Sequence, residues 1–325
     1  MINDPQPGES AVPSEADAER LQPDSANQTA DRIVVGIRDS GADHYLAALG
    51  LAARMSRQRA ATITLIHGSL PRLAIAASRT EARHLAHGRE VVEEARLTLS
   101  TMVDPSTQVH AEAVPKTGVD ALLQESRTAA TLILQRRNLS ALGRAFNSAT
   151  SHTVAAQAAC PVIVVRHDQL DSEPSRGIVV GIGPDSGVRA LQLGVLEAAV
   201  RKCPLTAVHV WDLPFSPTYG GRVDPDEEEL AEATRWADSF LASAVADVAK
   251  LHPDLELHAR SVRGVTEDGL LQECEHAELL IVERHRDAQL ASIGLGKLTR
   301  HLLDHAPCPV MITPLAQRDG MPLGI

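Results

Sequence analysis

The sequence predicts an α/β protein that contains two similar doubly wound domains, each built on a five-stranded parallel sheet, arranged as a pseudo-symmetric pair. Three observations lead to this prediction. The chain has 325 residues, and a domain typically takes roughly 150 residues. Short segments of the first half recur in the second half in the same order. Runs of Ile, Val and Leu alternate with helix-length stretches, which is the pattern of βαβ units.

The internal repeat is the most informative of these features, because several matches in one order indicate a duplicated domain. The segment 32–37 returns as 177–182, and both contain Ile-Val-Val-Gly-Ile. Three further matches pair 122–125 with 270–273, 132–134 with 280–282, and 160–164 with 308–312. The offset is 145 residues for the first match and 148 for the others, which we attribute to one short length difference.

Five strands are predicted in each unit. They are mostly continuous apolar runs, which is typical of parallel strands that are buried on both faces. The predicted strands are 32–37, 61–66, 108–113, 131–135 and 161–166 in the first unit, and 177–182, 205–210, 255–261, 278–282 and 308–313 in the second.

Two helices of the second unit carry recognisable start signals. The segment 186–201 has apolar residues at helical spacing, and Asp185 or Ser186 precedes it as a cap. The segment 225–250 opens with Pro225, followed by four acidic residues. Proline suits the first turn of a helix, and acidic side chains there face the positive end of the helix dipole.

The segments outside the two units are polar. Residues 1–30 hold six acidic side chains against one basic side chain and have no aromatic residue, so we expect a disordered acidic tail. The first unit then spans 31–166, a polar linker spans 167–176, the second unit spans 177–314, and a short tail spans 315–325. The short linker favours pairing of the two units within the chain.

Composition excludes several classes of function. The net charge of −11 disfavours a large nucleic-acid footprint, because phosphates repel an acidic surface. The N-terminus lacks a signal-peptide pattern, and no apolar run is long enough to cross a membrane. The four cysteines have neither metal-site nor disulfide spacing. We therefore expect a cytoplasmic protein with reduced thiols and no metal site.

Three segments together resemble the universal stress protein family in its tandem form. They are the opening Ile-Val-Val-Gly strand, the segment Val208–Trp211 at the second strand of the second unit, and the Pro-Cys-Pro junction at Ala306–Val310. The resemblance covers residues 31–314. It implies domains of the adenine-nucleotide alpha-hydrolase kind that pair through their final strands, here 162–166 and 309–313.

The nucleotide-binding branch of this family has an acidic residue after the first-strand glycine and a Gly-x2-Gly-x9-Gly-Ser/Thr phosphate loop. This chain departs from that pattern in both units. The acid position holds Arg38 in the first unit and Gly183 in the second. The loop positions hold Gln135, Asn138 and Ser148-Ala149 in the first unit, and Glu283, Arg286 and Gly296-Lys297 in the second. Side chains at glycine positions obstruct close approach of the backbone to phosphate.

The second unit nevertheless keeps a candidate nucleotide site, since ligands of open α/β sheets bind at the carboxyl ends of the strands. A glycine-rich helix start with a cation could hold an anion there. A P-loop is disfavoured, because it requires glycine where Ala291 stands and Ser or Thr where Leu298 stands. The candidate binding residues are Gly181, Gly183, His209, Gly294, Gly296 and Lys297.

Other clusters have simpler interpretations. His301 and His305 are four residues apart and would share a helix face, but the sequence offers no third metal ligand. His67 and His209 end matching strands, where a backbone hydrogen bond is the commoner explanation than a ligand. The segment 212–224 could cover the second pocket or pack on the following helix. No nucleophile elbow or paired carboxylates indicate catalysis.

These observations favour a non-catalytic stress-response or regulatory protein with a weak or lost nucleotide pocket, which acts through protein partners. No cofactor is assigned, and ATP is the candidate. One alternative is an ATP-binding protein with slow ATPase activity in the second unit, in which Lys297 steadies phosphate. Another is a structural tandem in which both pockets are lost. The final strands allow pairing within one chain and also a homodimer.

Overall fold

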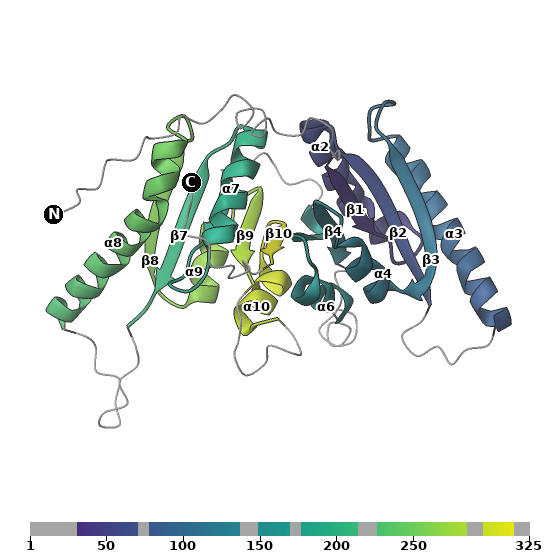
Figure 1. Ribbon diagram of the computed structural model, residues 1–325. Helices are drawn as coiled ribbons and strands as arrows, with labels where there is room; N and C mark the ends of the chain where they lie inside the picture. Colours follow the sequence, from purple (N-terminus) through teal and green to yellow (C-terminus); the bar gives the residue numbers. More distant parts are fainter. Residues whose placement is uncertain are drawn as a thin grey trace, which may run out of the picture. The chain divides into compact units, whose positions relative to one another are not determined.

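The computed structural model describes residues 31–70, 78–136, 149–169, 177–213, 226–284 and 295–314. The ten strands in this part of the chain form one sheet with the order β3-β2-β1-β4-β5-β10-β9-β6-β7-β8 (Figure 1). Each half contributes five consecutive strands to this order. The predicted α/β class with two similar five-stranded units is therefore confirmed.

The first half alternates strands with helices. Its strands are β1 (Arg32–Gly36), β2 (Thr62–Leu70), β3 (Val109–Thr117), β4 (Thr131–Arg136) and β5 (Val162–Arg166). Its helices are η2 (Ala42–His44), α2 (Leu46–Arg59), α3 (Ser78–Ser100), α4 (Gly118–Glu125) and α6 (Ala149–Gln157). A short 3-10 helix, η3 (His167–Gln169), follows β5 where the sequence predicts the start of the linker.

The second half repeats this arrangement. Its strands are β6 (Ile178–Gly181), β7 (Leu205–Trp211), β8 (Leu257–Arg263), β9 (Leu279–Glu283) and β10 (Val310–Thr313). Its helices are α7 (Val188–Arg201), α8 (Glu227–Leu251), α9 (Thr266–Glu273) and α10 (Lys297–His305). All ten predicted strands are present, with ends that differ by a few residues.

Strand pairing is parallel within each half and antiparallel between the halves. The antiparallel pair consists of β5 and β10, with Val164 opposite Val310 and Ile163 opposite Met311. These are the final strands of the two units. One continuous sheet therefore joins the two halves.

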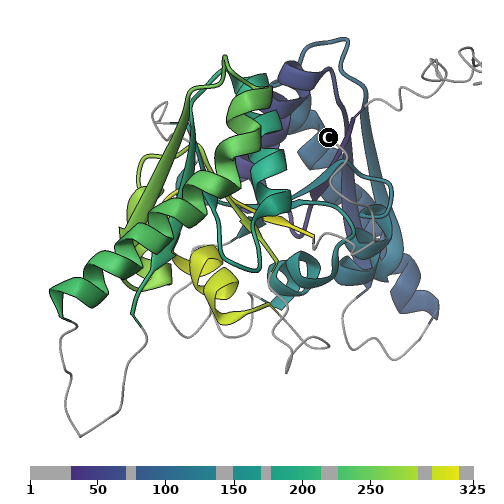
Figure 2. The ribbon, with the colours of Figure 1, turned by 60° about the vertical axis from the view of Figure 1, so that its left-hand side comes forward.

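Helices cover both faces of the sheet and divide the core into two layers. The residues packed on one face come from α2, α3, α7 and α8. Those on the other face come from α4, α6, α9 and α10. Figure 2 shows α8 lying along the strands of the second half.

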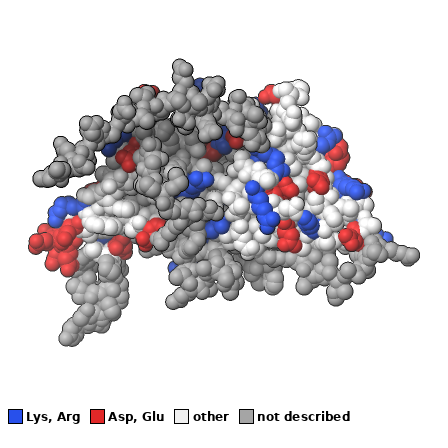
Figure 3. Space-filling model, viewed as in Figure 1, with Lys and Arg blue, Asp and Glu red and all other residues white. Residues whose placement is uncertain are grey.

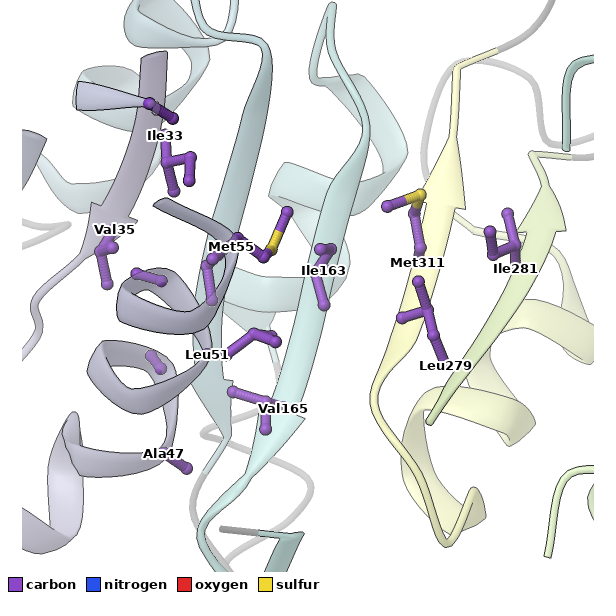
Figure 4. Close-up of a cluster of buried hydrophobic side chains, with 14 of the residues drawn as sticks. Ile33, Val35, Ala47, Leu51, Met55, Ile163, Val165, Leu279, Ile281 and Met311 are labelled. Carbon is purple, nitrogen blue, oxygen red and sulfur yellow. The ribbon is translucent and has the colours of Figure 1, made fainter. Parts of the chain in front are cut away.

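The layer that contains α2 runs across the junction of the two halves. Figure 4 shows apolar side chains of the first half facing those of β10 and β9 along the same face. The labelled members are Ile33, Val35, Ala47, Leu51, Met55, Ile163, Val165, Leu279, Ile281 and Met311. Because the same core spans β5 and β10, the apolar contacts reinforce their backbone pairing.

Two length differences, not one, separate the halves. The offset between matched residues is 145 at β1 and β6 (Ile33 and Ile178), and it is 142 at β2 and β7 (Ile63 and Leu205). The offset then rises to 148 at β3 and β8, where Val109 pairs with Ile63 and Leu257 pairs with Leu205. The first half is therefore longer between its first two strands, and the second half is longer between its second and third strands.

Helix capping also differs from one prediction. The N-cap of α7 is Gly187, so neither Asp185 nor Ser186 caps this helix. Gly187 has a φ of 111°, and a β-carbon there would lie 2.9 Å from the Cα atom of Ile182. A glycine fits this left-handed conformation at little cost. In α8 the predicted start holds, with the side chain of Asp226 accepting a hydrogen bond of 2.8 Å from the Glu229 amide.

Several predictions fall outside the described residues. These are the disordered tail at 1–30, the short tail at 315–325, the linker beyond residue 169, most of the segment 212–224, and Gly294. The described start of the linker packs against the second half, since the Gln169 side chain donates a hydrogen bond of 3.0 Å to the Ala306 carbonyl.

Candidate functional site

The candidate site lies at the carboxyl edge of the parallel strands in each half, where ligands of open α/β sheets bind. In the second half this edge carries the ends of β6, β7 and β9 and the start of α7. The predicted residues Gly181, Gly183 and His209 all lie at the ends of β6 and β7. The structure thus brings these three to the expected edge of the sheet.

The start of α7 at this edge is occupied by a carboxylate from β9. Glu283 Oε2 accepts hydrogen bonds from the backbone amides of Gly187 at 2.7 Å and Arg189 at 3.3 Å. The first amides of a helix have no partners within the helix and carry partial positive charge, so they attract anions. Glu283 therefore fills this anion-binding position from within the protein.

The first half has the matching arrangement with an uncharged side chain. Gln135 lies next to the last residue of β4, at the position that Glu283 has in β9, and its Oε1 accepts a hydrogen bond of 3.1 Å from the Ala48 amide in α2. Its Nε2 donates a hydrogen bond of 2.7 Å to the Asp43 carbonyl. In both halves, a long side chain therefore lies against the start of a helix. Each of these side chains stands where the nucleotide-binding pattern has its first phosphate-loop glycine.

A further obstruction is specific to the first half. Its longer connection after β1 contains η2 and leads to Tyr45, whose side chain is 1% exposed. The Tyr45 hydroxyl donates a hydrogen bond of 2.8 Å to Glu94 of α3, and the Gly41 amide donates one of 3.1 Å to the same carboxylate. The extra residues therefore seat an aromatic ring and a carboxylate beside the start of α2.

The paired histidines are held by the backbone in the same way in both halves. His67 Nδ1 donates a hydrogen bond of 3.0 Å to the Ile37 carbonyl, and His209 Nδ1 donates one of 2.9 Å to the Ile182 carbonyl. Burial lowers the pKa of His67 below its usual value, which the Ile37 carbonyl partly opposes. Both imidazoles therefore link the first strand of their half to the second.

His209 also packs against two aromatic rings of α8. Its ring centroid lies 4.7 Å from that of Phe240 and 5.9 Å from that of Trp236. Its Nε2 is buried and makes no hydrogen bond in the described part of the chain. These contacts account for the burial of His209 by packing, while Trp236 stays 54% exposed.

Lys297 and Gly296 stand together at the start of α10. This helix packs on the opposite face of the sheet from α7. The Lys297 ammonium group forms an exposed ion pair with Glu267 at 3.7 Å, and the Lys297 side chain is 93% exposed. Gly296 is the N-cap of α10 and provides no side-chain cap. In the described part of the chain, the Lys297 ammonium group is thus paired with a carboxylate of α9, and α10 and α7 cover opposite faces of the sheet.

Arg38 and Gly183 stand where the nucleotide-binding pattern has its acidic residue, and both make contacts of their own. Arg38 lies 3.5 Å from the Asp39 carboxylate, which also lies 3.6 Å from His44. Gly183 pairs with Ser186 through two backbone hydrogen bonds, of 3.0 and 3.2 Å, and closes a tight turn before α7. The Asp39 carboxylate thus has Arg38 and His44 as neighbours. Gly183 belongs to the turn that leads into α7.

The described part of the chain also contains the pair of histidines on α10. His301 and His305 share a face of α10 as predicted, with ring centroids 4.4 Å apart. No group of three or more His, Cys, Asp or Glu side chains is arranged to hold a metal ion among the described residues. None of the helices in this part is long and apolar enough to span a membrane.

Two similar units of alternating strands and helices that share one sheet define a tandem protein of the doubly wound α/β class. The model of the universal stress protein family matches the chain twice, at residues 29–166 and 175–314. The chain therefore belongs to the universal stress protein family.

The chain is also similar to individual proteins and solved structures. A universal stress protein from Mycolicibacterium smegmatis is 29% identical over 297 residues, which cover 86% of this chain and 96% of that protein. The structure of one from Archaeoglobus fulgidus has a TM-score of 0.63 at 12% identity and covers 88% of this chain and 99% of that one. A family structure in complex with cAMP covers 43% of this chain and 98% of its own, with 22% identity and a TM-score of 0.33.

Sequence reasoning identified Glu283 as a departure from the glycine pattern but missed what it binds. It also missed the Tyr45 and Glu94 pair. A signal for the longer connection after β1 exists in the sequence. The matched first strands lie 145 residues apart, whereas His67 and His209 lie 142 residues apart. The capping contacts themselves join segments that lie far apart in the sequence.

Proposed function

We propose that this protein is a non-catalytic, cytoplasmic stress-response module whose nucleotide pockets are filled by its own side chains and which acts through protein partners. The observation that carries the proposal is the Glu283 carboxylate on the first amides of α7, matched by Gln135 at the start of α2. An ATP phosphate that approached this edge in the second half would meet a fixed negative charge.

The two pockets differ in how they are blocked. In the first half, Tyr45 and Glu94 occupy the space beside α2 in addition to Gln135. In the second half, Glu283 alone caps α7 among the contacts described. Any residual nucleotide affinity is therefore expected in the second half.

Surface charge and cysteine state support the rest of the proposal. On the face shown in Figure 3, Lys and Arg side chains are interspersed with Asp and Glu over the first half. A face on which the two kinds of charge are mixed does not favour the binding of a nucleic-acid backbone. The four cysteines are free, as expected for a reducing compartment.

Calorimetry with Mg-ATP tests the blocked pocket. Wild-type protein is expected to give no saturable heat at millimolar ATP. The E283G variant removes the carboxylate and is expected to gain saturable binding in the second half. E283Q is the matched control, because it reproduces the uncharged cap of the first half. This variant is expected to give no saturable heat.

Each other outcome has a definite meaning. Saturable binding by the wild type, with slow release of inorganic phosphate, would replace the proposal with the alternative of a slow ATPase in the second half. This alternative is favoured by Gly296, which leaves the first amides of α10 without a side-chain cap. A folded E283G variant that binds no ATP would show that Glu283 is not the block.

A further inference from the structure

The last turns of α10 bring two histidine side chains together. His301 and His305 are four residues apart in this helix, and side chains at that spacing lie one above the other on the same face. Their ring centroids are 4.4 Å apart, and the ring planes are tilted by 42°. Among the described residues, no other two histidine rings are in contact. His301 is partly buried and His305 is exposed, so an ion from solvent can reach the pair.

The matched helix of the first half, α6, carries no such pair. The repeat offset of 148 residues places Thr153 where the second half has His301, and Gln157 where it has His305. The matched positions are exposed to the same degree, since Thr153 is partly buried like His301 and Gln157 is exposed like His305. The two halves therefore share the surface, and only the second half equips it with imidazoles.

We propose that His301 and His305 form a binding site for a divalent transition-metal ion of the zinc, nickel and copper class. The nitrogen of a neutral imidazole is a preferred ligand of these ions. Two histidines at this spacing on one helix face can bind the same ion. A structural zinc site takes four protein ligands, whereas two imidazoles leave the remaining positions to water. The proposed site is therefore one from which the ion exchanges.

The charges around the pair set how strongly it holds an ion. His305 ends α10, and the end of a helix carries partial negative charge, which favours a cation. The Asp304 carboxylate adds no ligand, because it lies 2.5 Å from Arg136 and 3.4 Å from His152 and is balanced by them. Arg300 is exposed on the same helix and opposes a bound cation. Binding is therefore expected to be reversible and to be removed by EDTA.

The site lies on the turn of α10 that the first half contacts. Arg136 donates a hydrogen bond of 2.5 Å to the Leu303 carbonyl, and Arg166 donates one of 2.8 Å to the Ala306 carbonyl. An ion bound by both histidines holds this turn in its helical form, because the two ligands have to stay one turn apart. Since the ion binds the folded chain and not the unfolded one, it stabilises the fold by mass action. Metal binding therefore supports the junction of the two halves.

Calorimetry with nickel(II) chloride on the untagged full chain tests the site. The wild type is expected to bind nickel saturably, and copper(II) more tightly, as the general order of affinities requires. H301Q and H305Q are each expected to weaken nickel binding at least about tenfold, because the second imidazole otherwise binds at a high effective concentration. The control is H87Q on α3, where the side chain is 64% exposed, and it is expected to leave nickel binding unchanged.

The T153H/Q157H variant adds a gain of function, because it transfers the pair to α6 and is expected to bind one more nickel ion than the wild type. Nickel is also expected to raise the thermal unfolding temperature of the wild type but not that of the H301Q/H305Q double variant.

Two results would overturn the proposal. One is equal nickel affinity of the wild type and the folded H301Q/H305Q variant, which would place any bound ion elsewhere. The other is the absence of saturable nickel binding by the wild type at millimolar concentration. This inference is independent of ATP binding, so neither test decides the other.

Discussion

Arg59 at the end of α2 forms an ion pair with Glu197 of α7, across the junction of the two halves. The same carboxylate also binds Arg201 at 3.2 Å, and Arg201 occupies the position in α7 that Arg59 occupies in α2. The Glu197 side chain is 3% exposed. One buried acid thus joins two matched arginines. This contact lies on the face of the sheet that α2 and α7 cover, and α6 and α10 cover the other face.

The E197A variant tests this junction. Removal of the acid leaves the Arg59 and Arg201 guanidinium groups without their shared partner, and breaking a buried pair costs about 3–5 kcal/mol. We expect the free energy of unfolding in urea to fall by that order. The matched control is E232A on the exposed surface of α8, which is expected to change stability by less than about 0.5 kcal/mol. Equal stability of the E197A and E232A variants would show that Glu197 does not stabilise the junction.

The first-strand glycines give a graded prediction. A β-carbon at Gly36 would lie 2.6 Å from the Leu134 Cδ2 atom, whereas one at Gly181 would lie 3.2 Å from the nearest side-chain atom, on Val282. Overpacking of a core costs about 1–3 kcal/mol. We expect G36A to destabilise the protein by that amount and G181A by less, as measured by thermal unfolding. The reverse order would show that packing is not what requires these glycines.

Two histidines predict how stability depends on pH. Burial lowers the pKa of His67 and of His152, although in His152 the Asp304 carboxylate opposes the shift. The unfolded chain therefore binds more protons at these positions than the folded chain does. Stability is fully present above the unfolded pKa of about 6.5 and is lost as the pH falls from there through the folded values.

Urea titrations from pH 7.5 to pH 5.5 measure this loss of stability, and we expect the H67Q variant to show a shallower fall than the wild type. NMR titration of the imidazole protons provides the direct check. An imidazole of His67 or His152 that titrates above its usual pKa would reverse the predicted sign. The control is a histidine on the exposed surface, such as His258, replaced by glutamine.

The Tyr45 hydroxyl supports the filled pocket of the first half. In Y45F the Glu94 carboxylate loses this donor and keeps the Gly41 amide. Loss of one such hydrogen bond is expected to cost about 1–2 kcal/mol, since the acceptor is charged. Chemical denaturation measures the loss, and Y45F is expected to remain unable to bind ATP because the ring still fills its site. A gain of binding would show that the hydroxyl, and not the ring, blocks the pocket.

The fold was predictable because its signals are local. The apolar runs at 132–134 and 162–165 and the repeat of Ile-Val-Val-Gly-Ile indicate where strands form and how many units exist. The cap of α7 was mispredicted for a related reason. Asp185 and Ser186 are good capping residues in sequence, but the Gly183–Ser186 turn places Gly187 at the cap.

The sequence by itself determined that a single βα domain was duplicated, that each copy has five strands, and that the glycine pattern for phosphate was altered at Gln135 and Glu283. Only the tertiary structure decided what those altered residues do, because each caps a helix about ninety residues earlier in the chain, a contact that no local pattern encodes. It also decided that α10, which starts at Lys297, and α7, which follows Gly183, cover opposite faces of the sheet. Such contacts depend on which faces of the sheet the helices cover, and this arrangement exists only once the whole sheet has assembled.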